Sequence, residues 1–242
     1  MLQPVTPSDP IPTPTEPPPA IRRVRQPLVP LPDAAAIDFG ASNTDAAAVV
    51  SGRLVEWTLP QNGAPDAVHV RRILAAQGIS PAQLSVIGVT GGHHRGLPDA
   101  IDGCPIRKIG ELAAIARGGQ ALAAGGPMEL PHQPLLVVSA GSGTAMVRAE
   151  GTRYLHVTGS GMGGGTLLGL GWLLLKSSDP TEIDRLAAQG SANQADLVLQ
   201  DIVTGPIGAL PPDATAVNFG RIVRLAGPPT REDLAAALVN MV

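Results

Sequence analysis

Three short turns of small residues carry the groups in this chain that are best suited to bind phosphate. The first follows Asp38 (IDFGASNTDAA, residues 37–47), the second is AGSGT (140–144), and the third is GSGMGGGT (159–166). Small side chains let backbone N–H groups approach an anion, and a carboxylate beside a phosphate loop commonly serves a divalent cation. Ser42, Asn43 and Thr44 add hydroxyl and amide donors. The third turn opens an apolar run, which predicts an anion site at the free N–H groups of a helix N-terminus.

Strand and helix patterns arrange these turns in two similar units. Each turn alone is weak evidence, because glycine turns join strands in most proteins. A strand, a glycine turn and a second strand open a unit twice, at Ile37 and at Val137. The patterns predict strands at 34–40, 46–50, 53–59, 84–92 and within 134–157, and helices at 66–78, 110–124, 163–175, 181–190, 194–203, 218–226 and 231–242. The sequence therefore predicts an α/β protein of two lobes, with the boundary in the Gly- and Pro-rich stretch 125–134.

The first 33 residues differ from the rest of the chain. Eleven of them are proline, which removes backbone donors and favours an extended polyproline conformation. We expect residues 1–33 to be a disordered tail that does not join the core, with the basic IRRVRQ segment solvated.

Composition narrows the class of function. The net charge is -3 and the five aromatic residues make up 2% of the chain, so a nucleic-acid binder is not expected. The single Cys104 excludes an internal disulfide and a multi-cysteine zinc site, which fits a reducing, cytoplasmic compartment. No signal peptide is expected from the first residues. Residues 157–175 are uncharged but rich in glycine, so we expect a buried helix there and no membrane span.

The order of several motifs resembles that of a known enzyme family. DFGAS, GVTGGHH, GELAAIARGG, SAGSGTAM, HVTGSGMGGGTLLGL, QADLVLQDI and TAVNFGRI occur as in type II, eukaryotic-like pantothenate kinases. These enzymes belong to the actin, sugar kinase and Hsp70 ATPase superfamily. The resemblance runs from about Ile37 to the end of the chain. It implies a duplicated, ribonuclease H-like fold with an N-terminal lobe at 34–128 and a C-terminal lobe at 129–242.

The resemblance also implies an activity and its residues. It implies ATP-dependent phosphorylation of pantothenate to 4'-phosphopantothenate, the first step of coenzyme A biosynthesis, with Mg²⁺, a homodimer and an acyl-CoA inhibitor. It assigns Asp38 to Mg²⁺, directly or through water, and to the γ-phosphate, and Glu111 to the general base. His156, Ser142 and Gly159 are assigned to the substrate. The residues assigned to nucleotide phosphates are Gly40, Ser42, Asn43, Gly141, Ser142, Gly143, Thr144, Gly163, Gly164 and Gly165.

Glu111 also has a simpler explanation. A positioned carboxylate can accept the proton that a primary alcohol loses as it attacks the γ-phosphoryl group. A glutamate in the first turn of a helix also stabilises that helix through its dipole. The residue pattern alone favours the second explanation, and the resemblance favours the first.

Three positions depart from the family. Asp45 occupies the position where the first loop of the family commonly has lysine. Ala145 replaces a serine of the second loop, and His156 replaces the substrate-binding arginine. Histidine lacks the bidentate fork of arginine, although Arg153 lies three residues away. The chain ends within the predicted helix 231–242, which suggests a truncated C-terminal lobe. The alternative function is a catalytically weak pseudokinase that senses nucleotide or acyl-CoA, and a third is an ATPase activator of a partner.

Other polar residues have simpler interpretations. His93 and His94 follow a glycine turn, but no acidic or cysteine cluster is near them in the sequence, which favours a polar loop over a metal site. Asp196 and Asp201 fall on one predicted helix and are expected on its solvated face. Two aromatic residues are expected to serve packing: Trp57 and Trp172.

Overall fold

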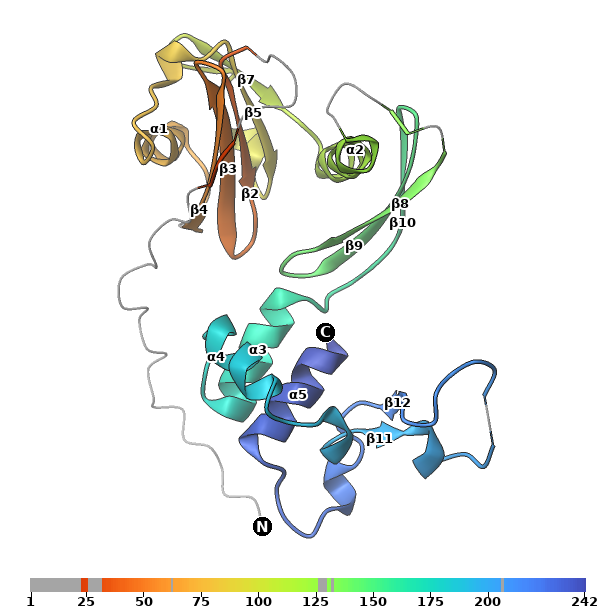
Figure 1. The fold of residues 1–242 in the computed structure, drawn as a ribbon. Coiled ribbons are helices and arrows are strands. Elements are labelled where there is room, and N and C mark those ends of the chain that lie inside the picture. Colours follow the sequence, from red (N-terminus) through yellow and green to blue (C-terminus); the bar gives the residue numbers. More distant parts are fainter. Residues whose placement is uncertain (1–22, 26–31, 62, 126–129, 132, 206) are drawn as a thin grey trace. The chain divides into compact units, whose positions relative to one another are not determined.

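The computed structural model of the chain describes residues 23–25, 32–61, 63–125, 130–131, 133–205 and 207–242 (Figure 1). The chain divides into two compact units, the first ending at Glu111 and the second running from Leu112 to Val242. The lobes expected at 34–128 and 129–242 stay a prediction, and part of the expected linker, residues 126–129 and 132, lies outside the described residues.

The first unit is built on a seven-stranded mixed sheet. In order across the sheet, the strands are β1 (Arg23–Arg25), β4 (Arg53–Pro60), β3 (Asn43–Val50), β2 (Ala34–Phe39), β5 (Val86–Gly91), β7 (Cys104–Lys108) and β6 (Ala100–Ile101). β2 pairs antiparallel with β3 and parallel with β5, and β5 pairs parallel with β7. The parallel strands β2 and β5 need a crossover connection. Helix α1 (Ala67–Ala75) lies in this connection, between β4 and β5 in the chain.

The predicted strands and helix of this unit are confirmed, whereas β6 and β7 were not predicted. Asp66 caps α1 by accepting a hydrogen bond from His69 N at 2.7 Å. The helix buries Val70, Ile73 and Leu74 against the sheet. The indole of Trp57, 2% exposed, donates to Ile73 O at 3.2 Å, so Trp57 is a packing residue as expected.

The tail prediction is wrong at one point. Arg23–Arg25 forms β1, which pairs antiparallel with β4 at the edge of the sheet. This segment contains no proline, so each of its residues has a backbone N–H group for pairing. The other calls on the tail concern residues 1–22 and 26–31, which lie outside the described residues.

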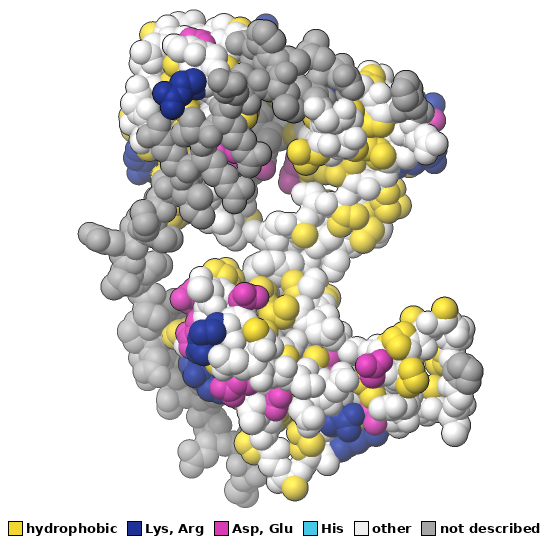
Figure 2. Space-filling model, in the orientation of Figure 1, with side chains coloured by type: hydrophobic (Ala, Val, Ile, Leu, Met, Phe, Trp, Pro, Cys, Tyr) yellow, Lys and Arg dark blue, Asp and Glu magenta, His cyan; other side chains and the backbone are white. Residues whose placement is uncertain are grey.

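The second unit begins with a helix packed on a small sheet. The sheet contains β8 (Leu135–Ala140), β9 (Thr144–Glu150) and β10 (Arg153–Ser160), all antiparallel, in the order β10-β9-β8. Helix α2 (Glu111–Ala124) contributes Ala116 to a buried cluster with Val147 and Ala149. Leu136, Val138 and Leu155 are each more than half exposed, and Figure 2 shows apolar side chains on the surface over these strands.

Three further helices form a second core in this unit. They are α3 (Gly164–Leu175), α4 (Pro180–Ala187) and α5 (Arg231–Met241), and they bury Leu175, Ile183 and Leu238 together. The expectation that 163–175 is a buried helix is only half right. α3 buries Gly171 and Leu175, whereas Trp172, Leu173 and Leu174 are exposed, because α4 and α5 cover one side of it. Within the described residues, no helix is long and apolar enough to span a membrane.

The predicted helices at 194–203 and 218–226 are wrong. The first segment forms a short turn (Ala192–Gln194), β11 (Leu197–Val198) and another turn (Leu199–Asp201). The second follows β12 (Thr215–Val217), which pairs antiparallel with β11. Phe219 has a positive φ of 57°, which a helix cannot accommodate, and a short 3₁₀ turn (Ile222–Arg224) follows.

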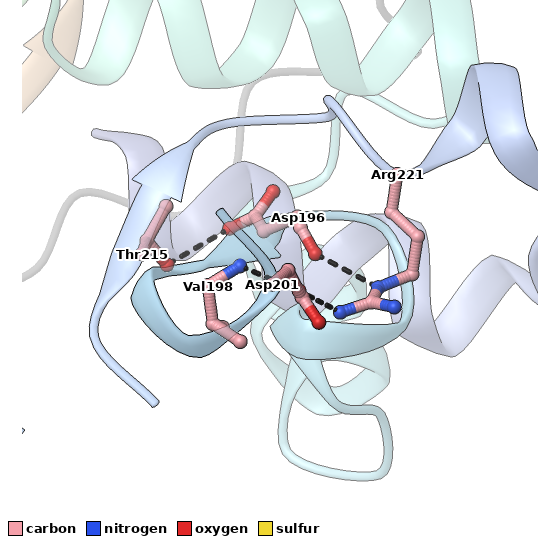
Figure 3. Close-up of polar contacts among 5 residues, drawn as sticks. All are labelled: Asp196, Val198, Asp201, Thr215 and Arg221. Atoms are coloured by element: carbon pink, nitrogen blue, oxygen red, sulfur yellow. Dashed lines mark hydrogen bonds and ion pairs between the residues drawn. The ribbon is translucent and has the colours of Figure 1, made fainter. Parts of the chain in front are cut away.

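Asp196 organises this region from a fully buried position rather than from a solvated face (Figure 3). Its carboxylate accepts hydrogen bonds from Phe219 N at 2.7 Å, from Thr215 Oγ1 at 3.3 Å and from Asn240 Nδ2 at 3.1 Å. The guanidinium of Arg221 donates to Asp196 O and pairs with the carboxylate of Asp201. A buried carboxylate is stable only when donors compensate its desolvation, and here the donors come from three separate segments.

Asp196→Ala should destabilise the protein strongly. Removing the carboxylate leaves the N–H of Phe219 and the hydroxyl of Thr215, both partly buried, without this acceptor, and each unsatisfied buried group costs about 1–3 kcal/mol. Asn240 keeps Thr215 Oγ1 as an acceptor. We expect the free energy of unfolding to fall by about 3 kcal/mol in denaturant titrations followed by circular dichroism. Asp213→Ala, at an exposed loop position, is the matched control and should change it by less than about 0.5 kcal/mol. Equal effects for the two variants would contradict the role of Asp196.

Candidate functional site

The first unit places Asp38 near the carboxyl end of β2, beside Thr90 on the parallel strand β5. Ligands of open α/β sheets bind beyond the carboxyl ends of the strands. The turn after β5 folds back onto β2, because Gly92 N donates to Phe39 O at 2.7 Å. Gly91 has a φ of +84°, and Asp38 Oδ1 and Phe39 O occupy the space that a Cβ would need. Only glycine therefore fits against Asp38 at this position.

The surroundings of Asp38 are unfavourable to its charge. Partial burial raises the pKa of its carboxyl group, and the carboxylates of Glu111 and Asp45 raise it further. His94 acts in the opposite direction and lowers this pKa. Asp45 is the residue paired with Asp38 across β2 and β3. A cation bound here would relieve the repulsion among the three carboxylates.

The remaining residues of the first turn have different surroundings. A Cβ on Gly40 would lie 2.7 Å from Asn43 O, which is too close for any side chain, so this tight turn requires glycine. Asn43 is exposed at the start of β3, and Ser42 is exposed in the turn before it. Thr44 does not offer the donor expected from the sequence: it is fully buried, and its hydroxyl donates to Gln61 Oε1 at 2.6 Å.

Glu111 begins α2, as the sequence predicts, and its side chain is exposed. Its carboxylate acts on Asp38 electrostatically, since it is one of the two carboxylates that raise the pKa of Asp38. The roles expected for Asp38 on the metal and for Glu111 on the substrate proton stay predictions.

In the second unit, the second and third glycine turns are joined backbone to backbone. Gly164 N donates to Gly141 O at 2.8 Å, and Gly165 N donates to Ser142 O at 3.0 Å. A Cβ on Gly163 would lie 2.8 Å from Gly141 O, Gly143 Cα and Ser142 O. These distances are too short for any side chain, so the glycine run is what permits the two turns to meet.

This contact corrects the prediction of a free helix N-terminus. Two N–H groups in the first turn of α3, those of Gly164 and Gly165, are already used by the second glycine turn. Thr144 closes the arrangement from the start of β9, since its Oγ1 donates to Met162 O at 2.9 Å. The structure therefore gives Gly164 and Gly165 a part in holding the turns together, and their assignment to phosphate stays a prediction.

Two of the residues assigned to the substrate, His156 and Gly159, lie close together on β10. His156 is exposed, and the pairing of β10 with β9 shifts between His156 and Thr158. A Cβ on Gly159 would lie 3.5 Å from His156 Nε2 and 2.8 Å from Thr144 O, so the imidazole lies beside this glycine. Ala145 is the pairing partner of Gly159 on β9. Arg153 lies at the far, amino-terminal end of β10.

Comparison with known proteins identifies the second half of the chain. Residues 126–242 match the family model described as Fumble. A type II pantothenate kinase of Oceanobacillus iheyensis is 34% identical over 154 residues, which are 64% of this chain and 56% of that protein. Pantothenate kinase 1 of Oryza sativa subsp. japonica is 39% identical over 113 residues, 44% of this chain and 17% of that protein.

Residues 126–242, called the Fumble segment below, are therefore similar to the Fumble family. The resemblance to type II pantothenate kinases is thereby confirmed, and both joined glycine turns lie within the Fumble segment. The chain spans little more than half of the Oceanobacillus relative and a smaller share of the rice protein.

The fold agrees with that of a solved structure that holds a nucleotide analogue. The activator of 2-hydroxyisocaproyl-CoA dehydratase from Clostridium difficile, with bound ADPNP, superimposes with a TM-score of 0.52 at 14% identity. The match covers 85% of this chain and 70% of the activator. The predicted fold class, a mixed α/β fold, is confirmed, and the chain shares this fold with the activator.

Gly163→Ala tests the junction of the two turns in the Fumble segment. The φ of Gly163 is extended, so the cost of the added Cβ is steric alone. We expect the free energy of unfolding to fall by about 1–3 kcal/mol, as for other overpacked sites. Gly161→Ala is the matched control because a Cβ there meets nothing within 4 Å. The role of the junction would be refuted if both variants unfolded like the parent protein in thermal and denaturant titrations.

Asp38→Asn should stabilise the protein at neutral pH. The pKa of Asp38 is raised above its ordinary value of 3.8, so folding disfavours the charged form. The resulting cost is absent below the ordinary pKa, grows as the pH rises through the folded pKa, and is complete above it. The melting temperature of Asp38→Asn should therefore exceed that of the parent at pH 7 and match it near pH 3.

Asp102→Asn provides a control of opposite sign. The hydrogen-bonded ion pair with Arg71 holds the pKa of Asp102 below its ordinary value, so the substitution should lower the melting temperature at pH 7. A lower melting temperature for Asp38→Asn at pH 7 would show that the Asp38 carboxylate is stabilising.

Proposed function

We propose that this chain carries out the ATP-dependent phosphorylation of pantothenate to 4'-phosphopantothenate. One observation carries the proposal: the two glycine turns that are joined backbone to backbone lie in the part of the chain that matches the Fumble family model. The relatives that support it are named as pantothenate kinases, and the chain spans part of their length.

In the proposed reaction, each candidate group has a defined role. Backbone N–H groups of the turns around Gly40, Gly143 and Gly163, with the side chains of Ser42, Asn43 and Ser142, would bind the phosphates of ATP. The Thr144 hydroxyl already donates to Met162 O, so Thr144 would contribute by holding the third turn. The carboxylate of Glu111 would accept the proton of the primary hydroxyl as its oxygen attacks the γ-phosphorus. The β–γ bridging oxygen leaves with ADP. His156, Ser142 and Gly159 would hold pantothenate.

The surroundings of Asp38 fit a magnesium ion. Asp38 supplies an oxygen ligand among like charges that a cation would relieve. Among the described residues, no three metal-ligating side chains are close enough to form a complete cage. Mg²⁺ commonly keeps waters and takes one or two carboxylates together with substrate phosphates, so Asp38 would hold it directly or through water. When bound, the ion would neutralise charge on the phosphates.

The family also provides expectations for the oligomeric state, the location and the inhibition of this enzyme. By analogy with its family, we propose a homodimer in the cytoplasm that an acyl-CoA inhibits. Analytical ultracentrifugation of the purified chain tests the dimer.

A catalytically weak pseudokinase that binds nucleotide or acyl-CoA is the second candidate. Specific positions favour it: Asp45 places a negative charge opposite Asp38, and His156 offers one hydrogen bond where an arginine fork would offer two. Binding of ATP or CoA without turnover would support this candidate.

Glu111→Gln tests the proposed chemistry. The amide cannot accept a proton, so pantothenate-dependent ADP release should fall at least about 100-fold. The rise in melting temperature produced by Mg²⁺-ATP should remain, because Glu111 is not assigned to the nucleotide. The measurement is a coupled ADP-release assay with and without pantothenate.

The control separates catalysis from helix stability. If Glu111 acts only on the helix dipole, its replacement costs about 0.3–1 kcal/mol of stability and leaves turnover unchanged. Glu150→Gln, an exposed carboxylate on β9, should keep full turnover. Full turnover in Glu111→Gln would exclude Glu111 as the general base.

A further inference from the structure

His94 differs from its neighbour His93 in a way that the sequence does not reveal. Both follow the glycine turn at the end of β5. His93 is exposed and has a positive φ of 57°, whereas the side chain of His94 is buried, with 6% of the residue exposed. Burial of a titratable ring beside Asp38, in a turn expected to be a polar loop, calls for an explanation.

The ring of His94 is fixed by one short hydrogen bond. Its Nδ1 lies 2.6 Å from Gly91 O. A backbone carbonyl only accepts hydrogen bonds, so Nδ1 carries the proton in this contact. The bond closes the turn onto Gly91, the last residue of β5.

Gly91 in turn bears directly on Asp38. Asp38 Oδ1 lies in the space that a Cβ on Gly91 would take, so any movement of Gly91 changes the room available to this carboxylate. The next residue, Gly92, donates from its N to Phe39 O at 2.7 Å and ties the same turn to β2. The turn is thus held at two points, with Asp38 between them.

We propose that His94 is a positioning residue for Asp38: by holding Gly91, it fixes where the Asp38 carboxylate can lie. The inference rests on the proposed kinase function, in which Asp38 serves the metal ion and the γ-phosphate.

Two substitutions separate this role from simple packing. His94→Ala removes the donor to Gly91 O, whereas His94→Asn keeps an N–H donor close to the position of Nδ1. His93→Asn is the matched control, because asparagine tolerates the positive φ of that residue.

Steady-state kinetics of pantothenate-dependent ADP release provide the first readout. A misplaced reacting group can cost up to about 100-fold in rate. We expect His94→Ala to lower kcat at least about 10-fold with little change in the KM for pantothenate, and His94→Asn to restore most of it. His93→Asn should match the parent. Full kcat in His94→Ala, or equal losses in the Ala and Asn variants, would overturn the proposal.

A thermal double-mutant cycle gives a second readout that does not depend on turnover. The change in melting temperature caused by Asp38→Asn is measured in the parent and in the His94→Ala background. Coupled positions give non-additive changes, whereas independent ones add. If the parent shows no pantothenate-dependent ADP release, the proposed function fails, and the cycle still decides on His94. Additive changes would refute the positioning role.

Discussion

Close backbone packing at glycine is the constraint on which the second unit depends. The turn between β8 and β9 and the turn before α3 meet through Gly164 and Gly165, and Gly163 leaves no room for a side chain. Backbone atoms can approach in this way only where Cβ atoms are absent. The strands and helices behind these turns have ordinary apolar cores, which supply rigidity but no specificity. The feature that distinguishes this unit is therefore the contact between its two glycine turns, and the strands and helices hold those turns in place.

The first unit is marked by repulsion among neighbouring carboxylates. It gathers the carboxylates of Asp38, Asp45 and Glu111 near one another, which costs stability in the absence of a cation. Such a cost is common at functional sites, where residues serve a ligand rather than the fold. The parallel strands β2 and β5 make the arrangement possible, because their carboxyl ends lie side by side and leave the turns that follow them close together.

Buried polar contacts join distant segments more specifically than apolar packing does. Asp196 accepts hydrogen bonds from Thr215, Phe219 and Asn240, which lie in separate segments. These bonds compensate the cost of burying the carboxylate only when the donors are arranged around it. His94 has a similar local effect on Gly91. In both cases a single side chain fixes a piece of backbone that has little regular secondary structure of its own.

Local patterns in the sequence determined most of the strands and the helices α1 to α5, because apolar periodicity, caps and glycine stops act within a few residues. The order of glycine motifs also predicted the resemblance to type II pantothenate kinases and the fold class. Tertiary structure alone decided the rest. The segment 194–203 has a helical pattern, yet the donors that reach Asp196 from 19 to 44 residues away draw it into turns and a short strand. The positions of Thr44 and His94 followed in the same way from partners at Gln61 and Gly91. Burial and hydrogen bonding depend on which groups the fold brings together, and no local pattern contains that information.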